Sequence, residues 1–293
     1  MSDSALSLRA RSEAEAARFP ALLARADQLA GTVLLGEHGR RRAGQGDDFW
    51  QYRPVQQGDS LRMIDWRRSA RSDVQYVRER EWQIAQSVML WVDGAASMRF
   101  ASQPDLPEKA DRARVLALAA SILLLRGGER VGLTGGALPP RRGRAQVERL
   151  AALFAQDGTE DYGAPEARGM LPHSRALFVS DFLGDFEPVR AALTKAADRG
   201  VRGILLQVLD PAEEAFPFRG RAIFESVGGT LAHETLKASD LRDRYLERLA
   251  ERKADLAHIC AVTGWRLHTH HTSAPAQSAL LWLHGALSGG HLT

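Results

Sequence analysis

Residues 88–98 read VMLWVDGAASM, and this stretch decides the fold. Its first half is an unbroken apolar run, which is typical of a strand buried on both faces of a parallel sheet. The run ends at Asp93 and Gly94, a change that indicates the end of the strand and a turn. Residues 176–181, ALFVSD, repeat the pattern with Asp181 in the last position. We expect these two strands to be neighbours in one sheet, each followed by an aspartate.

Outward from these strands, short apolar runs alternate with amphipathic segments. Strands are expected at residues 88–92, 130–133, 176–179, 204–209 and 265–269, and helices at 108–126, 145–155, 186–199 and 240–262. Apolar strands that alternate with helices predict a mostly parallel sheet with helices on both faces. We therefore expect a Rossmann-like α/β domain over residues 82–293.

The first 81 residues have a different character. Ser12 and Glu15 form a capping-box pattern, and the apolar residues after them recur at near-helical spacing, so a helix is expected to run to Ala30. Between residues 36 and 81, glycines and arginines mix with acids and show no clean period, apart from a short strand expected at Val74 to Val77. Residues 1–81 are thus predicted to hold an N-terminal helix and a small irregular module that contains β-strands.

Composition excludes several classes of protein. The 293 residues are 44% hydrophobic and 26% charged, which is typical of a folded chain and not of a disordered or fibrous one. A net charge of +3 gives no general attraction to nucleic acid or to an anionic membrane. The first residues lack the apolar segment of a secretory signal, and no apolar run reaches the roughly 20 residues of a membrane span. Cys260 has no second cysteine to pair with, so a reducing, cytoplasmic location is predicted.

Polar residues at the strand ends are the first candidates for a site, because open parallel sheets bind ligands beyond the carboxyl ends of their strands. Asp93 and Asp181 would face one cleft together with the hydroxyls of Ser97 and Ser180. Hard oxygen ligands of this kind suit Mg²⁺ or Ca²⁺. The alternative is that the two aspartates only cap the helices that follow them, by accepting hydrogen bonds from free backbone N–H groups.

The same residues resemble the metal-ion-dependent adhesion site of von Willebrand factor type A domains. That motif has Asp-x-Ser-x-Ser after a strand, a threonine in a later loop and an aspartate after a further strand. The resemblance implies Asp93, Ser97, Thr159 and Asp181 as ligands of a Mg²⁺ ion, with Ala95 in place of the first serine. Loss of that hydroxyl is expected to weaken metal retention. Either a water replaces it, or the same face binds its partner without metal.

The sequence upstream resembles the signature of the domain-of-unknown-function 58 family. It is carried by GEHGRRRAGQGDDF at 36–49, YRP at 52–54, GD at 58–59, LR at 61–62, IDW at 64–66, SAR at 69–71 and VRE at 77–79. In that family the module precedes a von Willebrand A-like domain, and the order here is the same. Asp48 departs from the glutamate that the family usually has before the phenylalanine. The resemblance implies a non-enzymatic adaptor that binds a MoxR-type AAA+ ATPase and client proteins.

The partner surface is expected on the upstream module. Its candidate residues are Arg40, Arg41, Arg42, Arg53, Asp59, Arg62, Asp65, Trp66 and Arg71. Two other functions stay open. Arginines with interleaved aromatic residues could bind nucleic acid, although nearby acids balance their charge, and Asp93 with Asp181 could serve a Mg²⁺-dependent phosphoryl-transfer or hydrolytic enzyme. The glycines near Gly44 lack the Gly-Lys-Ser/Thr ending of a phosphate-binding loop, so no nucleotide is expected.

Overall fold

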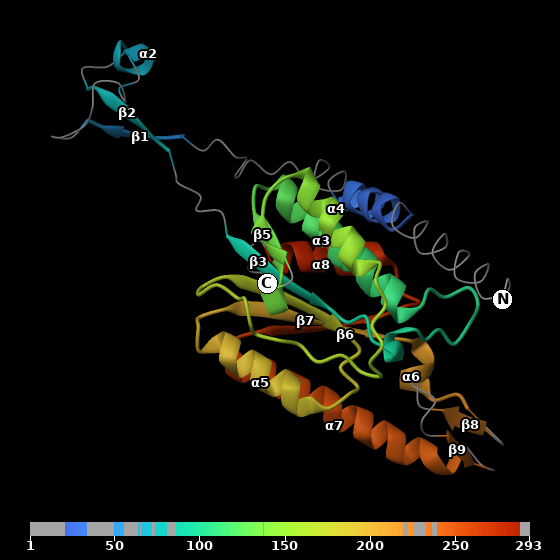
Figure 1. Cartoon of the computed structure of the whole chain (residues 1–293). Helices are drawn as coiled ribbons and strands as arrows, with labels where there is room; N and C mark the ends of the chain where they lie inside the picture. Colours follow the sequence, from blue (N-terminus) through green and yellow to red (C-terminus); the bar gives the residue numbers. More distant parts are fainter. Residues whose placement is uncertain are drawn as a thin grey trace. The chain divides into compact units, whose positions relative to one another are not determined.

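The structure is a computed structural model, in which the chain forms two units (Figure 1). It describes residues 21–33, 50–55, 64, 66–71, 74–80, 86–136, 138–218, 222–225, 232–235 and 239–287. One unit consists of residues 1–36 together with 86–293, and the other of residues 37–85. The larger unit holds the α/β sheet that the sequence predicts.

The larger unit is built on a six-stranded sheet with the order β10-β7-β6-β3-β4-β5. Its parallel strands are β3 (Ser87–Val92), β4 (Arg130–Leu133), β6 (Arg175–Ser180), β7 (Arg202–Leu209) and β10 (Arg266–His271). The remaining strand, β5 (Leu138–Arg141), pairs antiparallel with β4 at one edge. The chain enters the sheet at β3, adds β4 and β5 on one side, and then adds the other strands on the opposite side. The direction of strand addition therefore reverses between β3 and β6.

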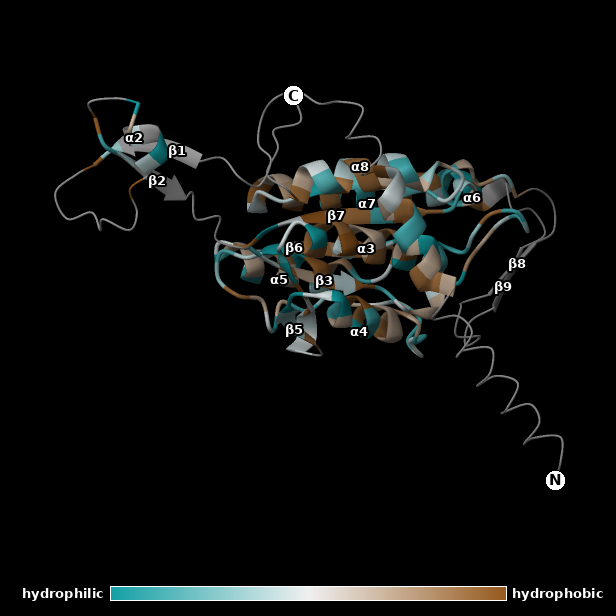
Figure 2. Ribbon diagram, turned by 90° about the horizontal axis from the view of Figure 1, so that it is seen from above, coloured by the Kyte–Doolittle hydropathy of each residue, from teal (hydrophilic) through white to brown (hydrophobic). Residues whose placement is uncertain are grey.

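Helices cover both faces of this sheet (Figure 1). On one face lie α3 (Lys109–Arg126), α4 (Arg144–Phe154) and α8 (Ala276–Leu287), and on the other α5 (Phe186–Ala197) and α7 (Ser239–Thr263). Each face has its own apolar cluster: Leu90 of β3 packs with Leu116 of α3, and Phe178 of β6 packs with Leu193 of α5. Figure 2 shows β7 in brown, the colour of hydrophobic residues. None of the helices in the described part of the chain has the length and apolar character needed to cross a membrane.

Residues 21–33 form a helix that belongs to the larger unit. Ala26 and Ala30 are both completely buried, and their spacing of four places them on one face of this helix. That face joins the apolar cluster of α3 and α8. The prediction placed this helix with the upstream module, but its apolar face completes the core of the α/β unit instead. The predicted start at Ser12 lies outside the described residues.

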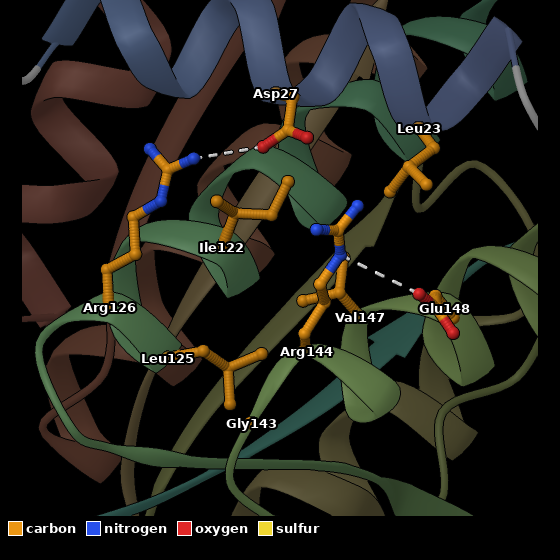
Figure 3. Close-up of a pocket in the computed structure, with 9 residues that line it drawn as sticks. All are labelled: Leu23, Asp27, Ile122, Leu125, Arg126, Gly143, Arg144, Val147 and Glu148. Carbon is orange, nitrogen blue, oxygen red and sulfur yellow. Dashed lines mark hydrogen bonds and ion pairs between the residues drawn. The ribbon is translucent and has the colours of Figure 1, made fainter.

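A pocket of about 290 Å³ lies between this helix, α3 and α4 (Figure 3). Apolar side chains, among them Leu23, Ile122 and Val147, line it, and charged side chains surround it. At its rim Arg126 of α3 donates a hydrogen bond of 3.0 Å to the carboxylate of Asp27. This contact links the N-terminal helix to α3 at the surface.

The smaller unit contains a two-stranded antiparallel sheet and a short helix. β1 (Trp50–Pro54) pairs with β2 (Tyr76–Arg80), and α2 (Trp66–Ser69) lies between them in the chain. The hydroxyl of Ser69 accepts a hydrogen bond of 2.9 Å from the backbone N–H of Tyr76, which ties α2 to β2. The strand predicted from Val74 starts two residues later than expected. A second small antiparallel pair, β8 (Ala222–Glu225) with β9 (Ala232–Thr235), belongs to the larger unit.

Candidate functional site

Three neighbouring strands end in aspartates at one edge of the sheet. β3 pairs in parallel with β6, and β6 with β7, so their carboxyl ends meet. Asp93 follows β3, Asp181 follows β6 and Asp210 follows β7, and each is 2% exposed or less. The expected neighbourhood of the first two strands is confirmed, whereas sequence analysis did not single out Asp210. This edge, at the point where strand addition reverses, is where open α/β sheets bind their ligands.

The three carboxylates share one local arrangement. In each, Oδ1 accepts a hydrogen bond from the backbone N–H two residues further along the chain. The donors are Ala95 at 2.8 Å, Leu183 at 3.0 Å and Ala212 at 2.8 Å. Such Asx-turns reverse the chain after a strand and satisfy a backbone donor that would otherwise be unpaired. The expected helix-capping role is not seen at Asp93 or Asp181, since Asp185 is the residue that caps α5; of the three, only Asp210 caps a helix, the short one that follows it at residues 211–215.

The second oxygen of each carboxylate accepts from a distant part of the chain, and here the three differ. Asp93 Oδ2 accepts from the Ser180 hydroxyl at 2.7 Å, and Asp210 Oδ2 accepts from the backbone N–H of Ser102 at 2.9 Å. Asp181 Oδ2 instead accepts from the ammonium of Lys109 at 2.8 Å. Two of the acids thus have neutral partners, and one has a charged partner.

The loop that follows α4 encloses Asp93. The backbone N–H of Gly163 donates to its carboxylate, and a Cβ atom at Gly163 would lie 2.2 Å from Asp93 Oδ1. Gly158 of the same loop donates a hydrogen bond of 2.8 Å to the carbonyl of Gly94. Burial raises the pKa of Asp93, and the charge of Asp181 adds to this, while the hydrogen bonds to Asp93 act in the opposite direction. Glycine is needed at position 163 because any side chain would collide with this carboxylate.

Lys109 places a buried ammonium between two carboxylates. It is the first residue of α3 and is 1% exposed. Its Nζ lies 2.8 Å from Asp181 Oδ2 and 2.5 Å from Oε1 of Glu213, which belongs to α6 (Pro211–Ala215). The ring of Phe100 adds a cation–π contact, with its centroid 5.8 Å from Nζ. Burial alone would lower the pKa of Lys109, but the two carboxylates outweigh it and raise the pKa above its ordinary value.

The residues predicted to hold a metal come together only in part. Asp93, Ser97 and Asp181 lie at the same edge of the sheet, and all three are buried. The Ser97 hydroxyl forms no hydrogen bond with the described residues. Thr159 lies in the loop after α4, where its side chain is exposed, and Ala95 brings no oxygen at all. Two of the five motif positions, Ala95 and Thr159, therefore supply no buried side-chain oxygen.

A divalent cation does not fit these residues as they are arranged. Mg²⁺ and Ca²⁺ need about six or more oxygen ligands, but the Asp93 carboxylate already accepts hydrogen bonds on both oxygens. In Asp181, the oxygen that does not take part in the turn, Oδ2, accepts a hydrogen bond from Lys109. Across the parts of the chain that the structure describes, no group of three or more His, Cys, Asp or Glu side chains is placed to hold a metal ion.

The predicted partner-binding residues lie mostly outside the described residues; these are Arg40, Arg41, Arg42, Asp59, Arg62 and Asp65. Arg53 belongs to β1. Trp66, at the start of α2, is 57% exposed, and Arg71 just after α2 is exposed as well. Exposed Trp and Arg are the residue types that most often dominate protein interfaces. Of the predicted partner-binding residues, Trp66 and Arg71 are thus described and exposed.

An exposed aromatic residue, Tyr162, lies at the rim of the strand-end site. Its side chain is 47% exposed and packs over Gly184, where an added Cβ would lie 2.7 Å from that of Tyr162. Arg252 of α7 fixes the loop beneath it by donating hydrogen bonds to the carbonyls of Phe182 and Gly184 at 2.8 and 2.5 Å. Sequence analysis missed Tyr162, because a single tyrosine in a loop carries no periodic signal.

A sequence family and several bacterial proteins are similar to this chain. The family described as "Protein of unknown function DUF58" matches residues 51–255. Uncharacterized protein Rv1480 of Mycobacterium tuberculosis and uncharacterized protein Mb1516 of Mycobacterium bovis are each 29% identical over 243 residues. The matched region covers 77% of this chain and 74% of each relative.

Two solved structures from Bacteroides show a more distant likeness. One is an aerotolerance-related membrane protein from Bacteroides fragilis, with a TM-score of 0.41, and the other is BatB from Bacteroides thetaiotaomicron, with a TM-score of 0.37. Each is 15% identical to this chain, and the match covers 70% of this chain and 99% of the other. Scores at this level support no functional conclusion.

Proposed function

The chain belongs to the DUF58 family of proteins of unknown function, and from this premise we propose that it is a non-enzymatic adaptor that binds a MoxR-type AAA+ ATPase and client proteins. We propose further that its α/β unit is a Rossmann-like domain of the von Willebrand A type. The strand order supports this second part. From the β5 edge, the strands are third, second, first, fourth, fifth and sixth in chain order, which is a doubly wound arrangement.

The strand-end acids already form hydrogen bonds within the protein, and this observation favours a binding function over a catalytic one. Both oxygens of Asp93, Asp181 and Asp210 accept hydrogen bonds from other groups of the protein. A hydrolytic or phosphoryl-transfer site needs a carboxylate that is available to move a proton or to hold a metal. Acids that are fully engaged instead fix the loops around them. A fixed rim is suited to recognition, because little conformational freedom is lost when a partner binds.

Exposed aromatic residues support contact with a protein partner. Tyr162 lies on the rim of the larger unit, and Trp66 lies on the smaller unit beside Arg71. Large aromatic side chains and arginine contribute most of the binding energy in many interfaces. We therefore expect each unit to supply part of the surface that the ATPase contacts.

The adaptor proposal is tested by binding and by ATP turnover. The tagged full chain should retain a MoxR-type ATPase from cells of the source organism, and the purified pair should show a changed rate of ATP hydrolysis. Trp66→Ala and Tyr162→Ala should each weaken the complex about tenfold or more, since each removes an exposed aromatic contact. Leu281→Ala is the matched control, because Leu281 is equally exposed, at 53%, but lies on α8. An ATPase that neither binds nor changes its turnover at saturating amounts of the chain contradicts the proposal.

The enzyme alternative has its own test. It requires the carboxylates of Asp93 and Asp181 to be available for chemistry, and both are engaged within the protein. Hydrolysis of a generic phosphoester that depends on a divalent metal and disappears in Asp93→Ala would favour the enzyme over the adaptor. Of the arginines on which nucleic-acid binding would depend, Arg40, Arg41, Arg42 and Arg62 lie outside the described residues.

A further inference from the structure

The strand-end site already contains a cation, the ammonium of Lys109. Its Nζ contacts one oxygen from the loop after β6, Asp181 Oδ2, and one from α6, Glu213 Oε1. Lys109 and Asp181 are each 1% exposed at their side chains, and Glu213 is 13% exposed. Asp181 and Glu213 lie 72 and 104 positions after Lys109 in the chain. The contact therefore holds α3, α6 and the β6 end together.

The ammonium lies where the Asp181 and Glu213 carboxylates converge, which is a place that calls for a positive charge. Two buried carboxylates repel one another unless a positive charge lies between them. The N–O distances of 2.8 and 2.5 Å are close to the roughly 2.3–2.6 Å at which Ca²⁺ binds oxygen. A divalent ion and the ammonium cannot both occupy this space, because they would overlap and repel one another.

We propose that Lys109 is the resident cation of this site: its ammonium substitutes for a divalent metal ion between Asp181 and Glu213, so that the site forms and stays folded without metal. Removing the lysine side chain should open a place for a divalent ion between the same two carboxylates. The proposal concerns the α/β unit alone and does not depend on the ATPase partner.

The first experiment measures the melting temperature of the full chain. After treatment with EDTA, the protein is heated in millimolar Ca²⁺, Mn²⁺ or Mg²⁺, with NaCl at matched ionic strength as the reference. The wild-type protein should show no saturable change in melting temperature. A saturable rise that disappears in Asp181→Asn would overturn the proposal, because it would show that a metal binds beside Lys109.

The second experiment uses the Lys109→Ala variant. It should have a lower melting temperature than the wild type without metal, and Ca²⁺ or Mn²⁺ should raise it by at least about 3 °C, since a ligand that binds only the folded state stabilises it. Two controls should remove the response: Lys109→Arg, which keeps a positive charge, and the double variant with Asp181→Asn, which loses one carboxylate. If Lys109→Ala folds but its melting temperature does not change with divalent ions, the proposal is wrong.

A refolding measurement covers the case in which Lys109→Ala does not accumulate in folded form. The variant is then diluted from urea with and without Ca²⁺, and native structure is followed by near-ultraviolet circular dichroism. Recovery that requires the ion supports the proposal, and failure to recover with the ion contradicts it. The triple variant Lys109→Met, Asp181→Asn, Glu213→Gln should fold without metal, because no unpaired charge remains. None of these readouts involves the ATPase, so a failed adaptor test and a failed cation test are distinguishable.

Discussion

The ends of β3 and β6 lie side by side in the sheet, and the same residue type follows each, yet the two aspartates are stabilised in different ways. Asp93 accepts hydrogen bonds from neutral donors, the hydroxyl of Ser180 and the backbone N–H groups of Ala95 and Gly163. Asp181 has the same type of turn bond, from Leu183, but its other oxygen faces the ammonium of Lys109.

The position of an aspartate at a strand end determines the hydrogen bond of one carboxylate oxygen and leaves the partner of the other oxygen open. The Asx-turn recurs at both strand ends because any aspartate there meets a free backbone N–H two residues on. The partner of the second oxygen depends on the surrounding elements. At the end of β3 it is the hydroxyl of Ser180, and at the end of β6 it is Lys109, from the start of α3. A strand-end aspartate therefore first closes a turn, and the partner of its second oxygen decides whether the carboxylate is paired with a neutral donor or with a charge.

The largest expected effect comes from removing the charged partner. Lys109→Met leaves Asp181 and Glu213 buried without a counter-charge, and losing one member of a buried ion pair costs about 3–5 kcal/mol. Ser180→Ala, the corresponding change at the β3 end, removes an uncharged hydroxyl that donates to Asp93 and accepts from the backbone N–H of Phe182, and it should cost only about 1–3 kcal/mol. Urea unfolding, with the free energy extrapolated to water, measures both.

Restoring neutrality sharpens this comparison. Asp181→Asn together with Glu213→Gln should recover much of the stability that Lys109→Met loses, because the remaining groups are uncharged. Equal costs for Lys109→Met and Ser180→Ala would show that the charge at the β6 end is not what distinguishes the two sites.

A smaller effect is expected in the pH dependence of the β3 end. Burial raises the pKa of Asp93 above its ordinary value of 3.8. As the pH rises through 3.8, the unfolded chain releases this proton while the folded chain still holds it, so the folded state loses stability relative to the unfolded state. The loss ends above the folded-state pKa. Asp93→Asn removes this component, so the stability of wild type minus variant should fall between pH 3 and neutral pH, as measured by urea midpoints at each pH. If the stability of wild type minus variant rises with pH instead, the pKa of Asp93 is lowered in the folded state and not raised.

Much of the fold was predictable from local patterns, as particular strands show. The predicted strand at residues 130–133 coincides with β4, and the predicted helix at 108–126 begins one residue before α3, because apolar runs and turn residues mark these ends. The edge strand β5 was missed because it contains Pro139 and Pro140, and proline is tolerated only at the edge of a sheet. There Gly132 of β4 lets the chain approach closely: an added Cβ would lie 2.6 Å from the nitrogen of Pro140.

The candidate site was predictable only in its first half. Asp93 and Asp181 follow recognisable strands, so their meeting could be expected before the structure was seen. Lys109 and Glu213 could not be assigned, because Lys109 reads as an ordinary charged residue at the start of a predicted helix, Glu213 lies in no predicted element, and their pairing depends on three-dimensional placement. The metal hypothesis rests on the two acids, the neighbouring hydroxyls and the motif that they resemble, and the sequence gives no local sign that a lysine reaches the acids.

The smallest expected effect concerns an ion pair of the same kind at the surface. Arg126 and Asp27 are joined at 3.0 Å on the rim of the pocket in Figure 3, with side chains that are 47% and 51% exposed. Water already solvates both groups, so Arg126→Ala should lower the free energy of unfolding by less than about 1 kcal/mol, and added salt should reduce the difference further. Urea unfolding at low and high NaCl measures this, with Arg190→Ala as a control at another exposed pair. A cost as large as that of Lys109→Met would mean that burial is not what makes the Lys109 cluster strong, and that the N-terminal helix depends on this contact for its attachment.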